Sequence, residues 1–194
     1  MTLANKITIL RILLIPVFVW VTLDYAVRFQ AGHVREWQPV LAFVIFAVAA
    51  LSDGLDGYIA RRYNQRTELG TWLDPLADKA LLISALVILS IDHGGAFEQL
   101  PLWFPILVIS RDVILLSGTM LLHFFTGHVT VRPRWVGKCA TFFQMLTLGW
   151  VLLQIQQPPF HWPMLAAGIF TFASGMWYIY DGVRQLTAHE SKTR

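Results

Sequence analysis

Four aspartates fall at short, regular spacings within the 26 residues from Asp53 to Asp78. Asp53 and Asp56 are three residues apart, and Asp74 and Asp78 are four apart. On α-helices, both spacings place the two side chains on one face, with Cβ atoms about 5–6 Å apart. Four carboxylates brought together repel one another unless protons or cations neutralise them. Two divalent cations about 3.5–4 Å apart would do so, and enzymes use that arrangement for phosphoryl displacement.

The residues around the aspartates indicate which cation and ligand to expect. The stretch contains no cysteine or histidine, and hard oxygen ligands favour Mg²⁺ or Mn²⁺ over Zn²⁺. Gly54 and Gly57 each cost about 1 kcal/mol against alanine inside a helix, but they let a ligand approach the backbone. Gly70 precedes the second pair in the same way, and Arg61 is placed to meet a phosphate. We therefore predict a site with two Mg²⁺ or Mn²⁺ ions and a phosphorylated substrate.

The aspartate stretch lies between long apolar segments. The chain has 194 residues, of which 56% are hydrophobic and 14% charged. Six apolar segments have about the length that a bilayer requires, and spanning segments must be helical because lipid offers no partner to open backbone groups. These segments are Ile7–Leu23, Val40–Tyr58, Leu76–Ile91, Leu102–Phe125, Ala140–Ile155 and Pro163–Tyr180. We predict an all-α integral membrane protein, a single domain over 1–194 built as a bundle of six transmembrane helices.

The basic residues are distributed unevenly between the two ends of such a bundle. Twelve of them fall on the side that holds both termini, whereas only Arg28 and Arg35 fall on the other side. Because cytoplasmic loops carry the excess of Lys and Arg, the termini and a polar cavity at the aspartates should face the cytoplasm. The single cysteine, Cys139, excludes an intramolecular disulfide. The net charge of +3 is modest and gives no reason to expect a nucleic-acid partner.

The fixed positions of this stretch resemble a known family. Asp53-x-x-Asp56-Gly57-x-x-Ala60-Arg61, then eight residues and Gly70-x-x-x-Asp74-x-x-x-Asp78, match the motif of the CDP-alcohol phosphotransferase family at all eight of its fixed positions. The six-span layout is also similar to that family. The resemblance implies that a CDP-linked lipid, usually CDP-diacylglycerol, gives its phosphatidyl group to an alcohol and releases CMP.

The resemblance also implies roles for individual residues. Asp53, Asp56 and Asp74 would ligate the metals. Asp78 would be the base that takes the proton of the acceptor hydroxyl, and it can also ligate a metal. Gly57 and Arg61 match positions that line the CDP site, to which we add Gly70. A homodimer in a bacterial inner membrane is expected from the family alone.

The beginning of the chain allows two interpretations. Asn5, Thr8 and Arg11 follow an Asn-x-x-Thr-x-x-Arg pattern, which is common in the phosphatidylglycerophosphate synthase and cardiolipin synthase branches of the family. The first interpretation places Asn5 near the nucleotide. The second is an amphipathic helix at the membrane surface, with Lys6 and Arg11 at the lipid headgroups.

Arg111 falls near the middle of the fourth apolar segment. A charge at that depth must face a cavity or a partner. The partner could be Asp112 or the carbonyls of another helix. Alternatively, Arg111 binds the phosphate of the acceptor or the pyrophosphate of the lipid, which is the interpretation that we favour.

Three more basic residues precede the fifth segment, namely Arg132, Arg134 and Lys138. They could hold anionic lipid headgroups at the cytoplasmic surface. However, Gly137-Lys138-x-x-Thr141-x-x-Gln144 resembles a stretch of phosphatidylglycerophosphate synthases. On a helix, this spacing would place Lys138 and Thr141 along one face, which Gln144 could share. Together with Arg111, the three basic residues are therefore our candidates for binding the acceptor.

These observations leave several functions open. The leading hypothesis is a transferase that uses CDP-diacylglycerol and sn-glycerol 3-phosphate to make phosphatidylglycerophosphate and CMP. The alternative is a cardiolipin synthase that uses phosphatidylglycerol, because Ser110-Arg111-Asp112-Val113 looks like that branch. A metal-ion transporter is remote, since it needs polar residues across the membrane and the first, fifth and sixth segments contain no acidic residue. A purely structural subunit does not account for the spacing of the aspartates.

Overall fold

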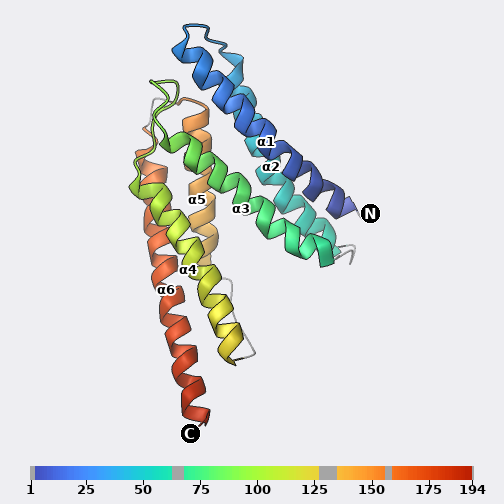
Figure 1. Cartoon of the computed structure of the whole chain (residues 1–194), viewed down its shortest axis with the longest axis vertical. Helices are drawn as coiled ribbons and strands as arrows, with labels where there is room; N and C mark the ends of the chain where they lie inside the picture. Colours follow the sequence, from blue (N-terminus) through green and yellow to red (C-terminus); the bar gives the residue numbers. More distant parts are fainter. Residues whose placement is uncertain (1–2, 63–67, 127–134, 156–158, 194) are drawn as a thin grey trace. The chain divides into compact units, whose positions relative to one another are not determined.

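The computed structural model describes residues 3–62, 68–126, 135–155 and 159–193 (Figure 1). Side chains are described for residues 7–52, 77, 79–120, 135–155 and 159–184. The described chain is helical apart from short turns and connections. Its helices are α1 (Leu3–Gln30), α2 (Trp37–Arg62), α3 (Glu68–Ser90), α4 (Trp103–Thr126), α5 (Trp135–Leu152) and α6 (His161–Thr193).

Each predicted apolar segment coincides with one helix, but the helix ends differ from the predicted ones. α5 begins at Trp135 rather than at Ala140, so Lys138 lies in its first turn and not in a loop. α6 continues beyond Tyr180 to Thr193. The helix ends differ because hydropathy identifies only the apolar part of a helix, whereas the backbone hydrogen bonds of the helix continue into the polar sequence beside it. The prediction of an all-α chain is confirmed for the described residues.

In the described part of the chain, two helical stretches are apolar and long enough to cross a membrane, namely Ile7–Gln30 and Trp103–Met120. Trp37–Ser52 and Lys79–Ser90 are shorter apolar helical stretches within the residues that the structure describes. Large apolar side chains are exposed along several helices; Trp20 is 67% exposed and Ile169 is 68% exposed. Apolar exposure on this scale fits contact with lipid. The number of six spans stays a prediction.

The chain divides into two compact units. Unit 1 comprises Met1–Leu100 and Leu148–Pro158, and unit 2 comprises Pro101–Thr147 and Pro159–Arg194. In unit 1, α1 packs against both α2 and α3, which also contact each other. The last turn of α5 belongs to this unit, where Gly149 lets it approach α2 closely, because a Cβ atom there would lie 3.0 Å from the Phe43 ring.

Polar contacts fix one end of unit 1, where α1 ends and α3 ends. Gln154 donates from Nε2 to the Tyr25 hydroxyl at 2.9 Å and to the Ala96 carbonyl at 2.6 Å. The Leu100 backbone N–H returns to the Leu89 carbonyl at 2.9 Å. These bonds satisfy backbone groups of the turn after α3. The other end of the unit, where α2 ends and α3 begins, carries the aspartate stretch.

Unit 2 is built from α4, α6 and the first part of α5. α4 packs along α6, and Gly168 makes room for Trp103, since a Cβ atom there would lie 3.0 Å from the indole ring. α5 is joined to α6 by stacked Phe143 and Phe170 rings, whose centroids are 5.5 Å apart. Close packing around small residues is the usual way in which membrane helices associate.

Candidate functional site

The helix register of the buried stripe of α2 extends to the positions of the first aspartate pair. Ala42, Phe46 and Ala49 are 0%, 3% and 0% exposed. Their spacings alternate between four and three residues, so they lie along one face of the helix. The same alternation reaches positions 53 and 56, and α2 remains helical throughout. Helix register therefore places Asp53 and Asp56 on the stripe by which α2 packs into unit 1.

The helix register of the buried stripe of α3 includes the positions of the second pair in the same way. Leu81, Ala85 and Ile88 are 1%, 0% and 6% exposed. Counting back from Leu81 by three and then by four residues gives positions 78 and 74, both within α3. Asp74 and Asp78 thus occupy the register by which α3 packs into unit 1. This agrees with the prediction that each pair shares one helix face.

A short connection brings the two pairs to one end of unit 1. α2 ends at Arg62 and α3 begins at Glu68, so only residues 63–67 lie between the helices. Both helices extend into polar sequence, beyond the apolar segments that end at Tyr58 and begin at Leu76. Helices joined so closely run antiparallel as neighbours, and α2 contacts α3.

The side chains of the central candidates lie outside the described residues. These candidates are Asp53, Asp56, Asp74 and Asp78 with Asn5, Gly57, Arg61 and Gly70. Within the described residues, no group of three or more His, Cys, Asp or Glu side chains could hold a metal. The four aspartate positions offer only carboxylate oxygens, a donor set that suits Mg²⁺ or Mn²⁺.

Arg11 is buried beside the first aspartate pair. Its side chain is 0% exposed, and its Nε donates to the Ser52 hydroxyl at 3.3 Å. Ser52 in turn donates to the Ala49 carbonyl at 2.7 Å. Thr8, one turn earlier on α1, is 1% exposed. The interpretation that placed Arg11 at the lipid headgroups is therefore wrong, because protein encloses the guanidinium.

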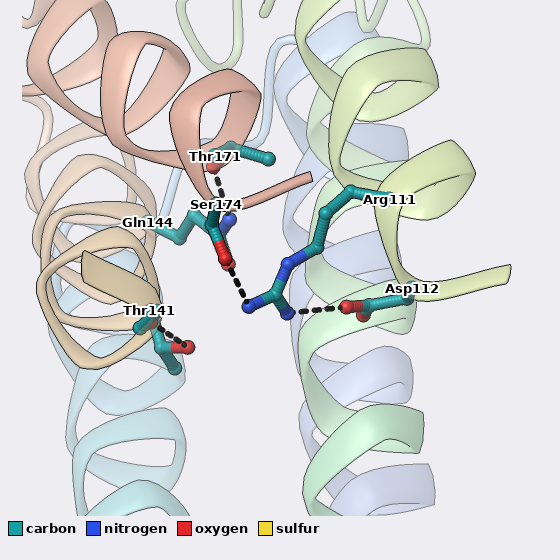
Figure 2. A network of polar contacts seen from close by, with 7 residues as sticks. Arg111, Asp112, Thr141, Gln144, Thr171 and Ser174 are labelled. Atoms are coloured by element: carbon teal, nitrogen blue, oxygen red, sulfur yellow. Dashed lines mark hydrogen bonds and ion pairs between the residues drawn. The ribbon is translucent and has the colours of Figure 1, made fainter. Parts of the chain in front are cut away.

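Arg111 forms a polar network between α4 and α6, which Figure 2 shows. Its Nη1 donates to Asp112 Oδ1 at 2.8 Å and its Nη2 donates to Ser174 Oγ at 3.0 Å. The ring centroid of Tyr178 lies 5.9 Å from the guanidinium carbon. The Asp112 partner that the sequence allowed is confirmed. However, the buried Nε atom of Arg111 has no hydrogen-bond partner within the described part of the chain.

Two glycines leave space for the Arg111 side chain. A Cβ atom at Gly137 on α5 would lie 3.0 Å from Arg111 Nη2, and one at Gly175 on α6 would lie 3.6 Å from its Cγ. The guanidinium is thus held between three helices of unit 2, with a side-chain exposure of 10%. The unpaired Nε–H of a guanidinium in such a place can donate a hydrogen bond to an oxygen atom of a ligand.

The residues predicted to share a face of α5 separate in the structure. Lys138 is exposed, and its Nζ lies 5.3 Å from the centroid of the Trp135 ring. Gln144 is 3% exposed and donates to Thr171 Oγ1 at 2.7 Å (Figure 2). Thr141 donates back to the Gly137 carbonyl at 3.2 Å. Gln144, whose place on that face the sequence left open, is turned toward α6 instead. Arg132 and Arg134 lie outside the described residues.

Sequence reasoning missed the polar residues of α6 and the role of Ser52. Thr171, Ser174 and Tyr178 are three and four residues apart in a helix that is otherwise apolar around them. This spacing is typical of one helix face and would have indicated a polar stripe facing Arg111 and Gln144. No comparable signal identified Ser52, whose partner lies forty-one residues away.

The chain is similar to known proteins over nearly all of its length. The family model described as CDP-alcohol phosphatidyltransferase matches residues 1–177. A protein of Mycobacterium tuberculosis named "Probable phosphatidylglycerophosphate synthase" is 34% identical over 95% of this chain and 83% of its own. Proteins named "CDP-diacylglycerol--glycerol-3-phosphate 3-phosphatidyltransferase" from Pseudomonas fluorescens and Escherichia coli are 33% and 31% identical, over 97% and 94% of this chain and 92% and 91% of their own. The chain therefore belongs to the CDP-alcohol phosphatidyltransferase family, whose members are membrane-bound transferases.

Proposed function

We propose that this protein transfers the phosphatidyl group of CDP-diacylglycerol to sn-glycerol 3-phosphate, which gives phosphatidylglycerophosphate and CMP. The observation that carries the proposal is the register of α2 and α3. Counted from the buried residues of each helix, that register supports placing all four aspartates at one end of unit 1, on the faces by which α2 and α3 pack. The names of the relatives, which cover more than nine-tenths of this chain, support the choice of substrates.

The four carboxylates of Asp53, Asp56, Asp74 and Asp78 would hold two Mg²⁺ or Mn²⁺ ions. When bound, these ions neutralise the pyrophosphate and stabilise the departing CMP. Asp78 takes the proton from the acceptor hydroxyl as its oxygen attacks the phosphorus that carries diacylglycerol. The bond from that phosphorus to the bridging oxygen breaks, and CMP leaves with the electron pair.

Other residues of the chain would hold the two substrates. Asn5, Gly57, Arg61 and Gly70 line the site for the CDP moiety. Arg111 in unit 2 binds the phosphate of the acceptor. Two observations support this role: the Arg111 side chain is nine-tenths buried, and its Nε atom has no hydrogen-bond partner within the described residues.

The basic residues near α5 complete the proposed acceptor site. Lys138 is exposed in the first turn of α5, near the N-terminal end where a helix favours anions. Arg132 and Arg134 precede it in the sequence. An acceptor that brings its own phosphate dianion fits such a set of cations better than a neutral alcohol does.

The proposed topology follows from the charge asymmetry. Six spans with both termini in the cytoplasm place the aspartate end in a cavity open to the cytoplasm, where a lipid headgroup meets a soluble substrate. A homodimer in the bacterial inner membrane completes the proposal. Reaction of an accessible single cysteine introduced next to Lys192, in a Cys139→Ser background, would test the side of the C-terminus.

An acceptor assay separates this proposal from the cardiolipin synthase alternative. Purified protein is given CDP-diacylglycerol and Mg²⁺ with glycerol 3-phosphate, phosphatidylglycerol, inositol phosphate or serine in separate reactions, and CMP release is measured. We expect CMP only with glycerol 3-phosphate. Release only with phosphatidylglycerol would establish the alternative, for which the Arg111–Asp112 dipeptide is the reason. No release with any acceptor would reject both.

A further inference from the structure

Arg11 is a charged side chain without an assigned role at the aspartate end of unit 1. It belongs to the buried stripe of α1, in which Thr8, Arg11 and Phe18 are 1%, 0% and 0% exposed. A guanidinium has five N–H donors and cannot lose its charge in a protein. Burial is therefore costly unless nearby groups supply both acceptors and negative charge.

The acidic side chains that the structure describes in unit 1 lie at the opposite end. They are Asp24, Glu36, Asp92 and Glu98. Asp24 is thirteen residues along α1, or about 20 Å at 1.5 Å per residue, and it pairs with Arg28 at 2.6 Å. Glu36 is in the turn after α1. Asp92 and Glu98 are in the turn after α3. This turn lies next to Gln30 at the end of α1, because a Cβ atom at Gly94 would lie 3.3 Å from the Gln30 side chain. Among the acidic residues of unit 1, this leaves those at the end that carries the aspartate stretch as the source of negative charge near Arg11.

The hydrogen bond to Ser52 connects Arg11 to that stretch directly. Ser52 immediately precedes Asp53 and is one helical turn before Asp56. The bond from Arg11 Nε to Ser52 Oγ, at 3.3 Å, joins α1 to α2 at this point. A shift of α1 against α2 here would move the backbone of both aspartates relative to α3. Removing a group that orients a metal ligand without touching the metal typically lowers metal affinity by about 10–100-fold.

We propose that Arg11 is a positioning residue for the metal-binding aspartates: through Ser52 it holds the aspartate-bearing end of α2 against α1 and supplies a fixed positive charge beside the carboxylates. The inference rests on the metal site of the proposed function. Arg11 acts through α2 and the carboxylates, and it does not touch the reacting atoms.

The test is Mn²⁺ binding to the full-length protein in detergent, without substrate, measured by the loss of the free Mn²⁺ signal in electron paramagnetic resonance. The variants are Arg11→Met, Arg11→Lys, Ser52→Ala and the double change Arg11→Met with Ser52→Ala. Ser84→Ala is the matched control, because Ser84 donates to the Ala80 carbonyl at 2.7 Å within α3 much as Ser52 donates within α2. Thermal unfolding and CDP binding are measured on each.

We expect Arg11→Met to weaken Mn²⁺ binding about tenfold, on the scale of a removed supporting group, and Ser52→Ala to weaken it by a smaller factor. The double variant should equal Arg11→Met alone, since both changes break one link. Arg11→Lys, which keeps the charge but loses Nε, should fall between wild type and Arg11→Met. Ser84→Ala should bind Mn²⁺ as wild type does.

Three results would overturn the inference. The first is an Mn²⁺ affinity that is unchanged in both Ser52→Ala and Arg11→Lys. This result would count against the inference even if Arg11→Met does not fold. The second is additive losses in the double variant. The third is a loss of CDP affinity with normal Mn²⁺ affinity, which would make Arg11 a nucleotide ligand. Equal Mn²⁺ binding by wild type and Asp53→Asn is a different failure, because it rejects the proposed metal site itself and the inference with it.

Discussion

Arg111 Nη2 donates to Ser174 Oγ at 3.0 Å, which joins the middle of α4 to α6. The bond matters because the same guanidinium pairs with Asp112 yet leaves its Nε without a partner among the described residues. Two of the three nitrogen atoms are thus fixed by protein and the third is available. The orientation of the fork, and hence the direction of the unpaired donor, depends on Ser174.

Removing the Ser174 hydroxyl should therefore weaken acceptor binding. Ser174→Ala loses a hydrogen bond to a charged group, which contributes about 1.5–3 kcal/mol, and part of that loss should appear as a KM for glycerol 3-phosphate raised about tenfold. The KM for CDP-diacylglycerol should not change. Ser117→Ala is the control, because Ser117 donates to a carbonyl of its own helix at 2.7 Å. Equal effects on both KM values would argue against a role for Arg111 in acceptor binding.

A methyl group at position 137 should disturb the same guanidinium from the side of α5. In Gly137→Ala the new Cβ would lie 3.0 Å from Arg111 Nη2 and 3.5 Å from Ser174 Oγ, so the guanidinium has to move. We expect the KM for glycerol 3-phosphate to rise several-fold while the protein remains folded. Gly118→Ala on α4 meets nothing within 4 Å; it should leave the KM unchanged and stabilise its helix by up to about 1 kcal/mol. An unchanged KM in Gly137→Ala would show that the network tolerates displacement.

The sequence predicts the helices of this protein better than it predicts the contacts of the candidate site. Apolar segments of bilayer length identified all of the helices that the structure describes, because hydrophobic length is a local property. The helix ends were predicted less well. Trp135 begins α5 and Thr193 ends α6 in sequence that is too polar to be counted as apolar, yet the backbone bonds of a helix continue there.

Some features of the candidate site could be predicted from the sequence, and others could not. The spacing of the aspartates could be read directly because it repeats with the helix, and the register of Ala49 and Leu81 supports it. The sequence left two interpretations open at the beginning of the chain, one of which placed Arg11 at the headgroups. The burial of Arg11 decides against that one, and it follows from how α1 packs on α2. Ser174 was missed because its partner, Arg111, is sixty-three residues away. Pairings over such distances depend on tertiary structure, which a local pattern does not contain.

Replacing the proposed base should stop the chemical step without preventing substrate binding. Asp78→Asn keeps the size of the side chain but cannot accept the proton of the acceptor hydroxyl, so kcat should fall by at least about 10²–10⁴-fold, the usual contribution of general base catalysis. CDP-lipid binding and the thermal midpoint should be nearly unchanged. Glu98→Gln, an exposed change in the turn after α3, is the charge-matched control and should keep full activity. Near-normal turnover in Asp78→Asn would remove Asp78 from the role of base.

Removal of the metal should abolish phosphatidyl transfer reversibly. A chelator takes Mg²⁺ from a site of hard oxygen ligands, and four carboxylates left without cations repel one another. We expect CMP release to stop in excess EDTA and to return with added Mg²⁺ or Mn²⁺, but not with Ca²⁺, whose longer bonds widen the site. Steady-state CMP release before and after readdition measures this. Full activity in EDTA would reject a metal-dependent mechanism.

The bond between Gln144 and Thr171 gives a prediction about stability that does not depend on the site. Gln144 Nε2 donates to Thr171 Oγ1 at 2.7 Å, and both side chains are buried. Gln144→Leu leaves the hydroxyl without its donor and should lower the free energy of unfolding by about 1–3 kcal/mol, the cost of an unsatisfied buried polar group. The double change with Thr171→Val replaces both partners with apolar groups and should recover most of the loss. Thermal unfolding in detergent, compared between the single and double variants, measures the recovery. A double variant that is less stable than Gln144→Leu would show that packing between α5 and α6 contributes more than this bond.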